Sequence, residues 1–523
     1  MNRKHLPNPI IVAILGLGTL ARLAPLGLQR FHEDEALYSS WGLRIASGED
    51  MWLAGIPVDK PPLFFYLQAG AFALLGPSET AARLPSLLAS VASIGLLYLL
   101  AQRLCGRPIA LVAAVLLAAS PFAISFAPTA FLDPLMEMWV LVACVAAAGG
   151  HWGWAGALLG LAGATKWEGV AFLPLVVGLG LCLHPVRPPP PTGSQALPTT
   201  NSVRGRRFLR AALGLLAIAA LVWGWDLARP QPSILWQLRA NYGGLALAQP
   251  EIWGERLRSW ASLLRYTFYH PWLNVLFLAG LPLLLLADVR ELAKISPSNR
   301  NSLPVDLLLV TFLTLFLAVL ILLRIPLWDR YLLALVPFGC LLLARVLWLP
   351  RRLFVAGHQL CPRSSGTSLT LTSRVRRASF FLSLLATALL LFTLPLSLRD
   401  AAVGRFPIGG DHGTYQGIEQ VVAYLRGHVM GGAILYHRWL GNHYRFYMYR
   451  FPYAFRWWQT PIELAQDAVA ASDVGRWIVF PDWQDERPAR TALSAKRLRL
   501  IPRHWTYRDD GSLSFTIYQI EGP

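Results

Sequence analysis

The chain has 523 residues, of which 55% are hydrophobic and only 15% are charged. This composition excludes a series of ordinary soluble domains and predicts a polytopic membrane protein. The formal net charge of +18 would suit a nucleic-acid-binding protein, but the lysines and arginines cluster in short loops between apolar runs. Membrane topology explains that clustering, so we expect no nucleic-acid partner. The five cysteines lie in or near apolar runs or basic loops and imply no disulfide framework.

Apolar runs of about 17–20 residues, the length that crosses a bilayer, recur along the chain. Eleven predicted spans cover residues 9–27, 86–104, 109–126, 134–150, 153–165, 168–184, 209–227, 272–288, 304–323, 330–349 and 379–397. Residues 62–76 are apolar but short, and we place them along the membrane surface. A crossing there would invert every later loop and turn the two most basic loops outward. The N-terminus is therefore predicted to be cytoplasmic, in an inner or plasma membrane.

The predicted transmembrane domain covers residues 1–398. It contains a first outer loop at 28–85, a flexible cytoplasmic linker at 185–208 and a second outer loop at 228–271. Residues 399–523 change in character, because short β-like runs alternate with helical patterns and Asp509-Asp510-Gly511 is typical of a hairpin turn. The predicted fold class is thus a polytopic α-helical membrane protein with a small extracytoplasmic α/β domain.

The first outer loop is polar where its neighbours are apolar. Glu33, Asp34 and Glu35 stand together, and Asp59 and Lys60 precede two prolines. An ionisable group at bilayer depth costs about 2.5–3.5 kcal/mol. The cluster therefore has a function or lies in water, and a solvated loop after a helix accounts for the composition equally well.

Six short motifs follow in a consistent order over about residues 10–350. They are Asp34-Glu35-Ala36-Leu37-Tyr38, Lys60-Pro61-Pro62-Leu63-Phe64-Phe65-Tyr66, Ala82-Arg83-Leu84-Pro85-Ser86, Phe131-Leu132-Asp133-Pro134, Lys166-Trp167-Glu168-Gly169, and Asp329-Arg330-Tyr331-Leu332-Leu333 followed by Pro337. Together these motifs resemble the GT-C membrane glycosyltransferases, in particular family 39 and its aminoarabinose-transferase relatives. The resemblance implies transfer of a hexose or pentose from a polyprenyl phosphate to an acceptor on the outer face of the membrane.

The acidic pair of the family is matched by Asp34 and Glu35. The resemblance implies that Asp34 is the general base that takes the proton of a hydroxyl acceptor, and that Glu35 supports Asp34 or positions the acceptor. Adjacent side chains of a helix point apart, so we do not expect both to touch one atom. A structural role for one of the two stays open. Since no second carboxylate is placed as a nucleophile, a single inverting displacement is expected.

Four residues are candidates for the donor phosphate, whose charge needs cations as the sugar leaves. They are Lys60, Lys166, Arg330 and Tyr331. The prolines after Lys60 fix its direction, and an unpaired Lys166 between two apolar runs would be costly unless it faced a phosphate or a polar cavity. Arg330 offers a planar set of donors. Pairing of Lys166 with Glu168, and snorkelling of Arg330 to the membrane interface, are the alternatives.

Two further acids receive supporting roles, and one of them suggests a metal. Asp133 either orients a cation or caps the helix that follows it. Asp59 stands where the aminoarabinose transferases carry a glutamate implicated in metal binding, and His270 resembles their later histidine. No cofactor is implied with certainty, but Asp59 and His270 form a candidate divalent-cation site.

Two other functions compete with sugar transfer. A transporter or flippase of a lipid-linked saccharide would also need basic residues along a membrane cavity, but such proteins tend to show internal repeats. We find no repeat between the two halves, and the polar residues favour one face over the midplane. An envelope scaffold without catalysis would leave the acid cluster and Lys166 unexplained. The acceptor, a glycolipid, a protein or an envelope glycan, is not specified by the motifs.

Overall fold

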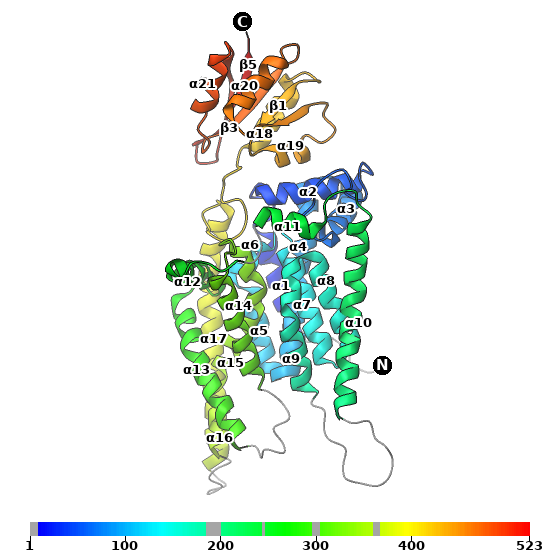
Figure 1. The fold of residues 1–523 in the computed structure, drawn as a ribbon. Coiled ribbons are helices and arrows are strands. Elements are labelled where there is room, and N and C mark those ends of the chain that lie inside the picture. The colour runs from blue at the N-terminus through cyan, green and yellow to red at the C-terminus, as the bar shows by residue number, and fades with distance from the viewer. Residues whose placement is uncertain (1–8, 185–199, 243–245, 295–303, 359–366, 523) are drawn as a thin grey trace, which may run out of the picture.

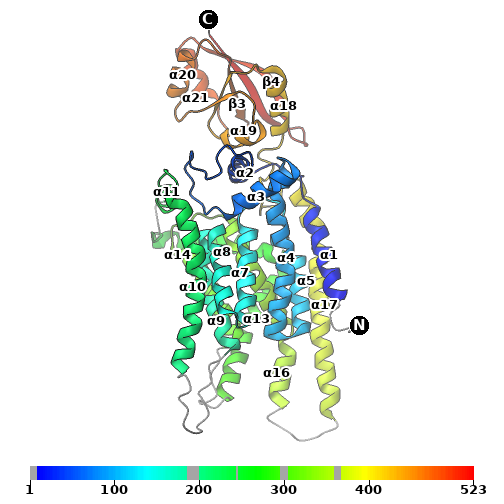
Figure 2. The same ribbon diagram turned by 90° about the vertical axis from the view of Figure 1, so that its right-hand side faces the viewer.

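The computed structural model describes residues 9–184, 200–242, 246–294, 304–358 and 367–522. The first part of the chain forms a bundle of helices, and the last part forms a smaller domain with a β-sheet that stands on one end of the bundle (Figure 1). Both views of the ribbon show the C-terminus at the far side of this smaller domain (Figure 2). The helical bundle with an appended sheet domain confirms the predicted fold class.

The bundle consists of apolar helices that run roughly side by side (Figures 1 and 2). They are α1 (Pro9–Leu23), α4 (Glu79–Cys105), α5 (Arg107–Ala118), α7 (Asp133–Ala148), α8 (Trp152–Thr165), α9 (Leu173–Leu183), α10 (Thr200–Leu227), α13 (Pro271–Lys294), α14 (Val305–Leu322), α15 (Val336–Leu347) and α17 (Thr367–Ala402). Every predicted span coincides with one of these helices. In the described part of the chain, six helical segments are long and apolar enough to cross a membrane. The chain is therefore an integral membrane protein.

Several predicted boundaries are wrong in detail. The interrupting elements are α6 (Pro121–Phe126), η2 (Trp167–Phe172) and η6 (Asp329–Leu335), and the short helix α16 (Leu349–His358) extends beyond α15. The span 109–126 breaks at Ser120, because Pro121 has no backbone N–H to continue the helix. The spans 168–184 and 330–349 both begin as 3-10 helices, a tighter geometry found mainly at helix ends. These irregular starts lie beside Lys166 and Arg330.

The predicted linker 185–208 is placed only in part. Residues 185–199 lie outside the described residues. From Thr200 onward the chain already belongs to α10, which corrects the predicted end of the linker. The physical reason is that residues 200–208 contain no proline, whereas the prolines that prompted the prediction all lie before residue 199.

A layer of shorter helices covers the end of the bundle that faces the sheet domain. It comprises α2 (Glu33–Ala46), α3 (Leu63–Leu75), α11 (Ile234–Tyr242), η3 (Pro250–Ile252), α12 (Trp253–Leu264) and η4 (Arg265–Thr267). Helix α2 crosses this end almost at right angles to the bundle axis (Figure 1). Both loops predicted on the outer face therefore lie at the same end. Helix α3 lies beside α2 in this layer, where we predicted a surface segment.

The C-terminal domain contains a mixed five-stranded sheet of order β2-β1-β3-β5-β4. Its strands are β1 (Ile434–His437), β2 (Ala454–Trp457), β3 (Arg476–Pro481), β4 (Arg499–Tyr507) and β5 (Leu513–Glu521), and its helices are α18 (Ile418–His428), α19 (Gly441–Tyr447), α20 (Pro461–Ala470) and α21 (Arg487–Ala495). Strand β1 pairs in parallel with β2 and β3, while β5 is antiparallel to β3 and β4. The predicted hairpin turn joins β4 to β5, and Gly511 supplies its positive φ of 81°.

The sheet domain rests on the segment that leads into α2. The rings of Phe446 in α19 and Phe31 lie 4.9 Å apart edge to face, and His443 Nε2 lies 2.9 Å from the carbonyl oxygen of Phe31. Tyr447 donates a hydrogen bond to Glu79 at the start of α4. Beside these contacts a cavity of about 670 Å³ opens between α2, α3 and the sheet domain. The domain thus helps to fix the start of α2.

Candidate active site

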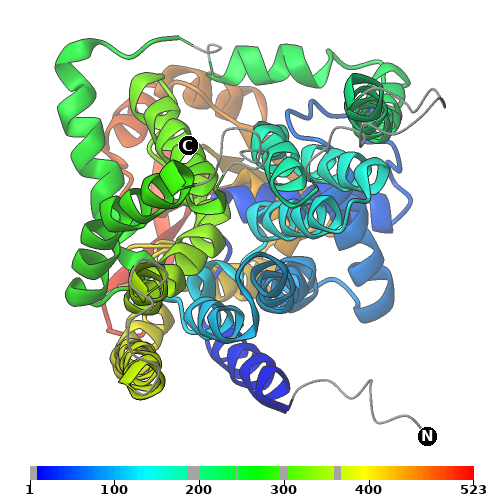
Figure 3. The same ribbon diagram turned by 90° about the horizontal axis from the view of Figure 1, so that it is seen from below.

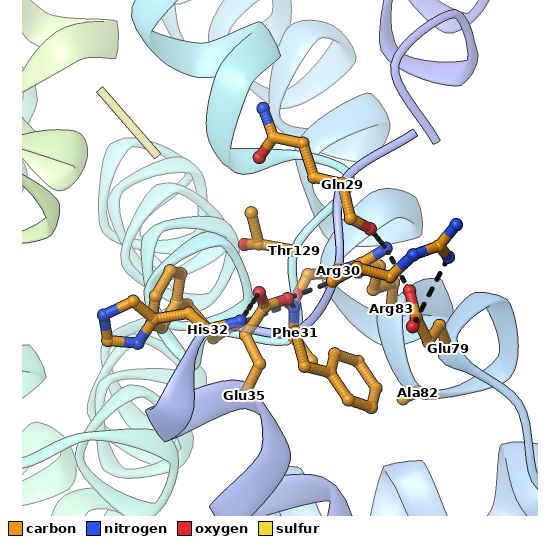
Figure 4. Close-up of polar contacts among 12 residues, drawn as sticks. Gln29, Arg30, Phe31, His32, Glu35, Glu79, Ala82, Arg83 and Thr129 are labelled. Carbon is orange, nitrogen blue, oxygen red and sulfur yellow. Dashed lines mark hydrogen bonds and ion pairs between the residues drawn. The ribbon is translucent and has the colours of Figure 1, made fainter. Parts of the chain in front are cut away.

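The first turn of α2 is held by a capping box. The backbone N–H of Asp34 donates to His32 Nδ1 at 3.1 Å. The backbone N–H of His32 donates to Glu35 Oε2 at 2.9 Å (Figure 4). Reciprocal capping of this kind satisfies N–H groups that a helix start leaves unpaired. It also fixes the direction in which Asp34 and Glu35 leave the helix.

Glu35 is fully buried and is committed to contacts inside the protein. Its Oε1 accepts hydrogen bonds from Arg83 Nε at 3.3 Å and from the backbone N–H of Ala130 at 2.6 Å. Arg83 is itself held by the carbonyl oxygen of Gln29 at 2.9 Å and by Glu79 at 3.1 Å (Figure 4). Glu35 therefore ties α2 to α4 and to the segment before α7. This placement favours the structural role that the sequence left open for one member of the acidic pair.

Asp34 points instead to η6, the 3-10 helix that leads into α15. Its Oδ2 lies 2.7 Å from Arg330 Nη1, and 29% of its side chain is exposed. Burial would raise the pKa of Asp34, but the charge of Arg330, helped by His32 and by the hydrogen bond, outweighs burial and lowers it below the usual aspartate value. Asp34 is thus an ionised and accessible carboxylate at neutral pH.

Arg330, in η6, is buried and is contacted by two aromatic rings. Its guanidinium lies over the ring of Trp328 at 4.2 Å and over that of Phe131 at 5.0 Å. Its neighbour Asp329 accepts the backbone N–H of Arg330 at 2.8 Å through one oxygen, and that of Gly409 at 2.8 Å through the other. Stacking and bonding of this kind hold the planar cation in one orientation. The segment after α17 is thereby joined to the site.

Lys166 lies between the end of α8 and the start of α7. Its Nζ is 2.8 Å from Asp133 Oδ1 and 3.4 Å from Glu168 Oε1, and it sits 4.3 Å from the ring centre of Tyr331. The side chains of Lys166 and Asp133 are almost fully buried. Asp133 thus pairs with a predicted phosphate-binding cation, and it also begins α7. The cation-pairing role fits this position, but the predicted capping role is wrong, because Leu132 is the N-cap of α7 and no side chain caps the helix.

Lys60 lies in the segment just before the short helix α3. Its Nζ forms a 2.8 Å ion pair with Asp59, whose other neighbour is Asn241 of α11 at 3.0 Å. The positive charge of Lys60 also contributes to the lowered pKa of Asp34, so the two groups are close enough to interact. The structure therefore gathers Asp34, Arg330, Tyr331, Lys166 and Asp133 with Lys60 at the end of the bundle covered by α2.

The structure does not bring His270 to Asp59. His270 lies just before α13, on the side of the bundle opposite α10, whereas Asp59 contacts Asn241 of α11, the helix that follows α10 (Figure 1). Within the described ranges, no group of three or more histidine, cysteine, aspartate or glutamate side chains is arranged to hold a metal ion. Asp59 instead pairs with Lys60, a cation that competes with any metal for the carboxylate. The predicted Asp59–His270 metal site is corrected on this point, because the contacts of Asp59 are with Lys60 and Asn241.

Two comparisons at the sequence level bear on this arrangement. Residues 59–187 match the family model described as dolichyl-phosphate-mannose-protein mannosyltransferase. A stretch of 88 residues is 34% identical to the "Putative mannosyltransferase YkcB" of Bacillus subtilis strain 168. That stretch covers 17% of this chain and 12% of the length of YkcB. The match is therefore local.

Comparisons of the fold reach much further. ArnT from Cupriavidus metallidurans superposes with a TM-score of 0.61 in its apo state and 0.57 when bound to undecaprenyl phosphate. Each comparison covers 97% of both chains at 14% sequence identity, which establishes a shared fold. The chain therefore has the fold of ArnT, and one segment of it matches a mannosyltransferase family model. The segment that matches the family model contains Lys60, Asp133 and Lys166, three of the residues gathered at the site.

Two residues of the candidate site were not predicted from the sequence. His32 was not recognised as the N-cap of α2, because histidine is not among the usual capping residues, although Glu35 stands at the spacing of a capping box. Asp329 belongs to the last of the six motifs, which predicts no role for it. Its adjacency to Arg330 was the available signal, whereas its contact with Gly409 depends on the folded chain.

Glu33 gives the site a pH-dependent stability that can be measured. Burial, followed by the negative charge of Asp34, raises the pKa of Glu33 from 4.5 to about 7. Because the folded-state pKa is the higher one, this stability is fully present below about pH 4.5 and is lost as the pH rises through 7. We expect Glu33→Gln to raise the apparent melting temperature at pH 8 and to leave it unchanged at pH 4. If the difference in melting temperature between the two proteins stays the same from pH 4 to pH 8, the raised pKa of Glu33 is contradicted.

Proposed function

We propose that this protein is a GT-C glycosyltransferase, which transfers a sugar from a polyprenyl-phosphate donor to a hydroxyl acceptor with inversion at the anomeric carbon. The observation that carries the proposal is the 2.7 Å pair of Asp34 with Arg330, which sets an accessible carboxylate beside a group of buried cations. The family match and the fold shared with ArnT, one of whose structures contains undecaprenyl phosphate, support this chemistry. The reaction would take place at the α2 end, on the extracytoplasmic side, with the N-terminus cytoplasmic.

Asp34 is the proposed general base. An acceptor hydroxyl becomes a nucleophile as its proton passes to a carboxylate within hydrogen-bond reach. Asp34 has one exposed edge, whereas both oxygens of Glu35 already accept hydrogen bonds within the protein. With Glu35 occupied in this way, a single carboxylate serves the reaction. That arrangement favours direct displacement over a covalent sugar–enzyme intermediate.

The proposed role of Lys60, Lys166, Arg330 and Tyr331 is to hold the donor phosphate. As the bond between sugar and phosphate breaks, negative charge builds up on the departing polyprenyl phosphate. Arg330 can offer two parallel N–H groups to a phosphate, and the lysines act as point charges. All three cations lie in surroundings with little water, where such stabilisation is stronger than in solution.

Donor binding would also prepare the base. In the structure Asp34 holds Arg330, and a lowered pKa makes Asp34 a weak base. A phosphate that accepts hydrogen bonds from the Arg330 guanidinium would weaken the pair of Arg330 with Asp34. The proton affinity of Asp34 would then rise. The base would then be strongest when the donor is in place.

The proposal is tested by transfer of radiolabelled sugar from polyprenyl phosphate in proteoliposomes. We expect transfer by the native protein, and for Lys60→Ala a rise in KM for the donor of about tenfold or more, as the loss of one charged contact of about 1.5–3 kcal/mol implies. Lys496→Ala, which removes an exposed lysine of the sheet domain, is the matched control and should behave as the native protein does.

Two outcomes would contradict the proposal. Full transfer with an unchanged donor KM in Lys60→Ala would remove Lys60 from the phosphate site. A native protein that moves labelled lipid across the bilayer but releases no sugar to any acceptor would be a flippase of lipid-linked saccharides. Glycolipids, proteins and envelope glycans, supplied separately as acceptors, would identify the acceptor class. A comparison of hexosyl and pentosyl donors would identify the sugar.

A further inference from the structure

A second cavity, of about 1130 Å³, lies at the opposite end of the bundle from Asp34. It is bounded by α1, by the start of α5, by the early part of α17, and by the chain from the end of α15 into α16. Viewed from below, the blue helix α1 and the yellow helix α17 lie on either side of α5 (Figure 3). The cavity is thus a groove on the flank of the bundle, with α5 as its floor.

Four arginines converge on this groove. They are Arg107 from α5, Arg351 from α16, and Arg376 and Arg377 from α17, and no acidic residue lines the cavity. In the part of the chain that the structure describes, none of the four forms an ion pair with a carboxylate. Four positive charges around one cavity repel one another, and an anion bound between them offsets this repulsion.

Two other arginines at the same end of the bundle are paired with acids. Arg345 pairs with Asp306, and Arg352 pairs with Asp288 at 2.6 Å and with Glu291 at 2.7 Å. Arg352 directly follows Arg351 in α16, yet only Arg352 is neutralised by the protein. The tendency of basic residues to gather at one membrane face explains why arginines occur here. It does not explain why four of them line one cavity without an acid.

From the arginines toward the middle of the bundle, the groove is apolar. Leu111 and Val115 of α5 and Phe380 and Leu384 of α17 line it. Phe380 is 58% exposed and Leu384 is 54% exposed, so this wall is open on the lipid side. At a rise of 1.5 Å per residue, the wall from residue 377 to residue 387 is about 15 Å long. That length accommodates a stretch of acyl chain alongside the helices.

We propose that this groove binds an anionic phospholipid, with its phosphate among the four arginines and an acyl chain along α5 and α17. The combination of a basic rim and an apolar wall fits an anionic amphiphile. Basic pockets between transmembrane helices are suited to anionic lipid headgroups. A soluble anion would leave the apolar wall unused. A zwitterionic lipid would bring its own positive charge to the arginines.

The proposed lipid site is distinct from the transfer site. It lies at the other end of the bundle and shares no residue with the group around Asp34. A lipid in the groove would bridge α1, α5, α16 and α17, which come from distant parts of the chain. Its expected effect is therefore on the stability of the bundle rather than on the chemistry of transfer.

The test uses the full chain purified in detergent and freed of lipid. Thermal unfolding and native mass spectrometry are followed while phosphatidylglycerol, phosphatidylcholine or glycerol phosphate is added. Phosphatidylglycerol is expected to raise the melting temperature and to be retained as one bound lipid. An equal effect of phosphatidylcholine, or of glycerol phosphate at the same concentration, would overturn the proposal, since then the acyl chain or the headgroup charge would be dispensable.

Paired variants sharpen the test. Arg376→Gln with Arg377→Gln is expected to weaken phosphatidylglycerol binding by roughly 30-fold, since each basic residue near an anionic lipid contributes about a factor of five. Arg376→Lys with Arg377→Lys keeps the charge and most of the binding, and Arg290→Gln, an exposed arginine of α13 outside the groove, changes nothing. Unchanged binding in the double glutamine variant would overturn the proposal. Preferential displacement of the phospholipid by an equal amount of polyprenyl phosphate would overturn it also, in favour of a carrier-lipid site.

Discussion

Asparagine in place of Asp34 is expected to lower the rate of sugar transfer by about 10²–10⁴-fold, the contribution typical of a positioned general base. Asparagine has nearly the same shape and can still accept a hydrogen bond from Arg330, but it cannot take a proton from an acceptor hydroxyl. The substitution also removes a negative charge that competes with the donor phosphate for Arg330. Affinity for polyprenyl phosphate is therefore expected to be unchanged or higher.

Single-turnover transfer and binding of polyprenyl phosphate, measured on the same preparation, separate these two effects. Glu33→Gln is the matched control, because it removes a neighbouring carboxylate of the same helix turn without touching Arg330 and should retain transfer. If Asp34→Asn keeps more than about a tenth of the native rate, Asp34 is not the base. If it loses donor binding together with transfer, Asp34 positions the phosphate site instead.

The pH dependence of transfer offers an independent check on Asp34. A general base must be ionised, so activity is lost as the pH falls through its pKa. Arg330 lowers the pKa of Asp34 despite its burial. In the free enzyme, the acid limb of kcat/KM should therefore lie below the ordinary range of an aspartate, and Arg330→Gln should move it upward. A limb near pH 7 in both proteins would point to a different base.

The meeting of the site residues at one end of the bundle was predictable from the sequence. Asp34 and Arg330 are separated by 296 positions and still form an ion pair. Span length and the placement of basic loops are local properties, and together they assign each intervening loop to a side. Residues at the same end of consecutive spans then come within reach of one another, because the helices of a bundle pack side by side.

The choice between Asp34 and Glu35 was not predictable in the same way. Both are acids in the first turn of α2, and the sequence alone treats them alike. The difference arises because Arg83 from α4 and the N–H of Ala130 converge on Glu35, while Arg330 reaches Asp34. These partners are set by how three distant segments pack. The pairing of Asp59 with His270 failed for the same reason, since a loop gives no indication of which neighbour it will approach.

Methionine in place of Lys166 is expected to lower the stability of the folded protein by about 3–5 kcal/mol, because it leaves Asp133 as an unpaired charge in the interior. The two side chains form a 2.8 Å pair and are only 5% and 2% exposed. Combining Lys166→Met with Asp133→Asn removes both charges and should restore most of the stability, since replacing a whole buried pair is often neutral. Thermal unfolding of the native protein, both single variants and the double variant completes the cycle.

Sugar transfer measured on the same four proteins distinguishes a structural lysine from a phosphate-binding one. If Lys166 holds the donor phosphate beside Tyr331, the double variant will be stable but will bind polyprenyl phosphate poorly, and its KM for the donor will stay high. Asp133→Asn alone keeps the cation and should retain more donor binding than the double variant. Recovery of both stability and transfer in the double variant would show that Lys166 serves only to neutralise Asp133, and the phosphate would then rest on Arg330 and Lys60.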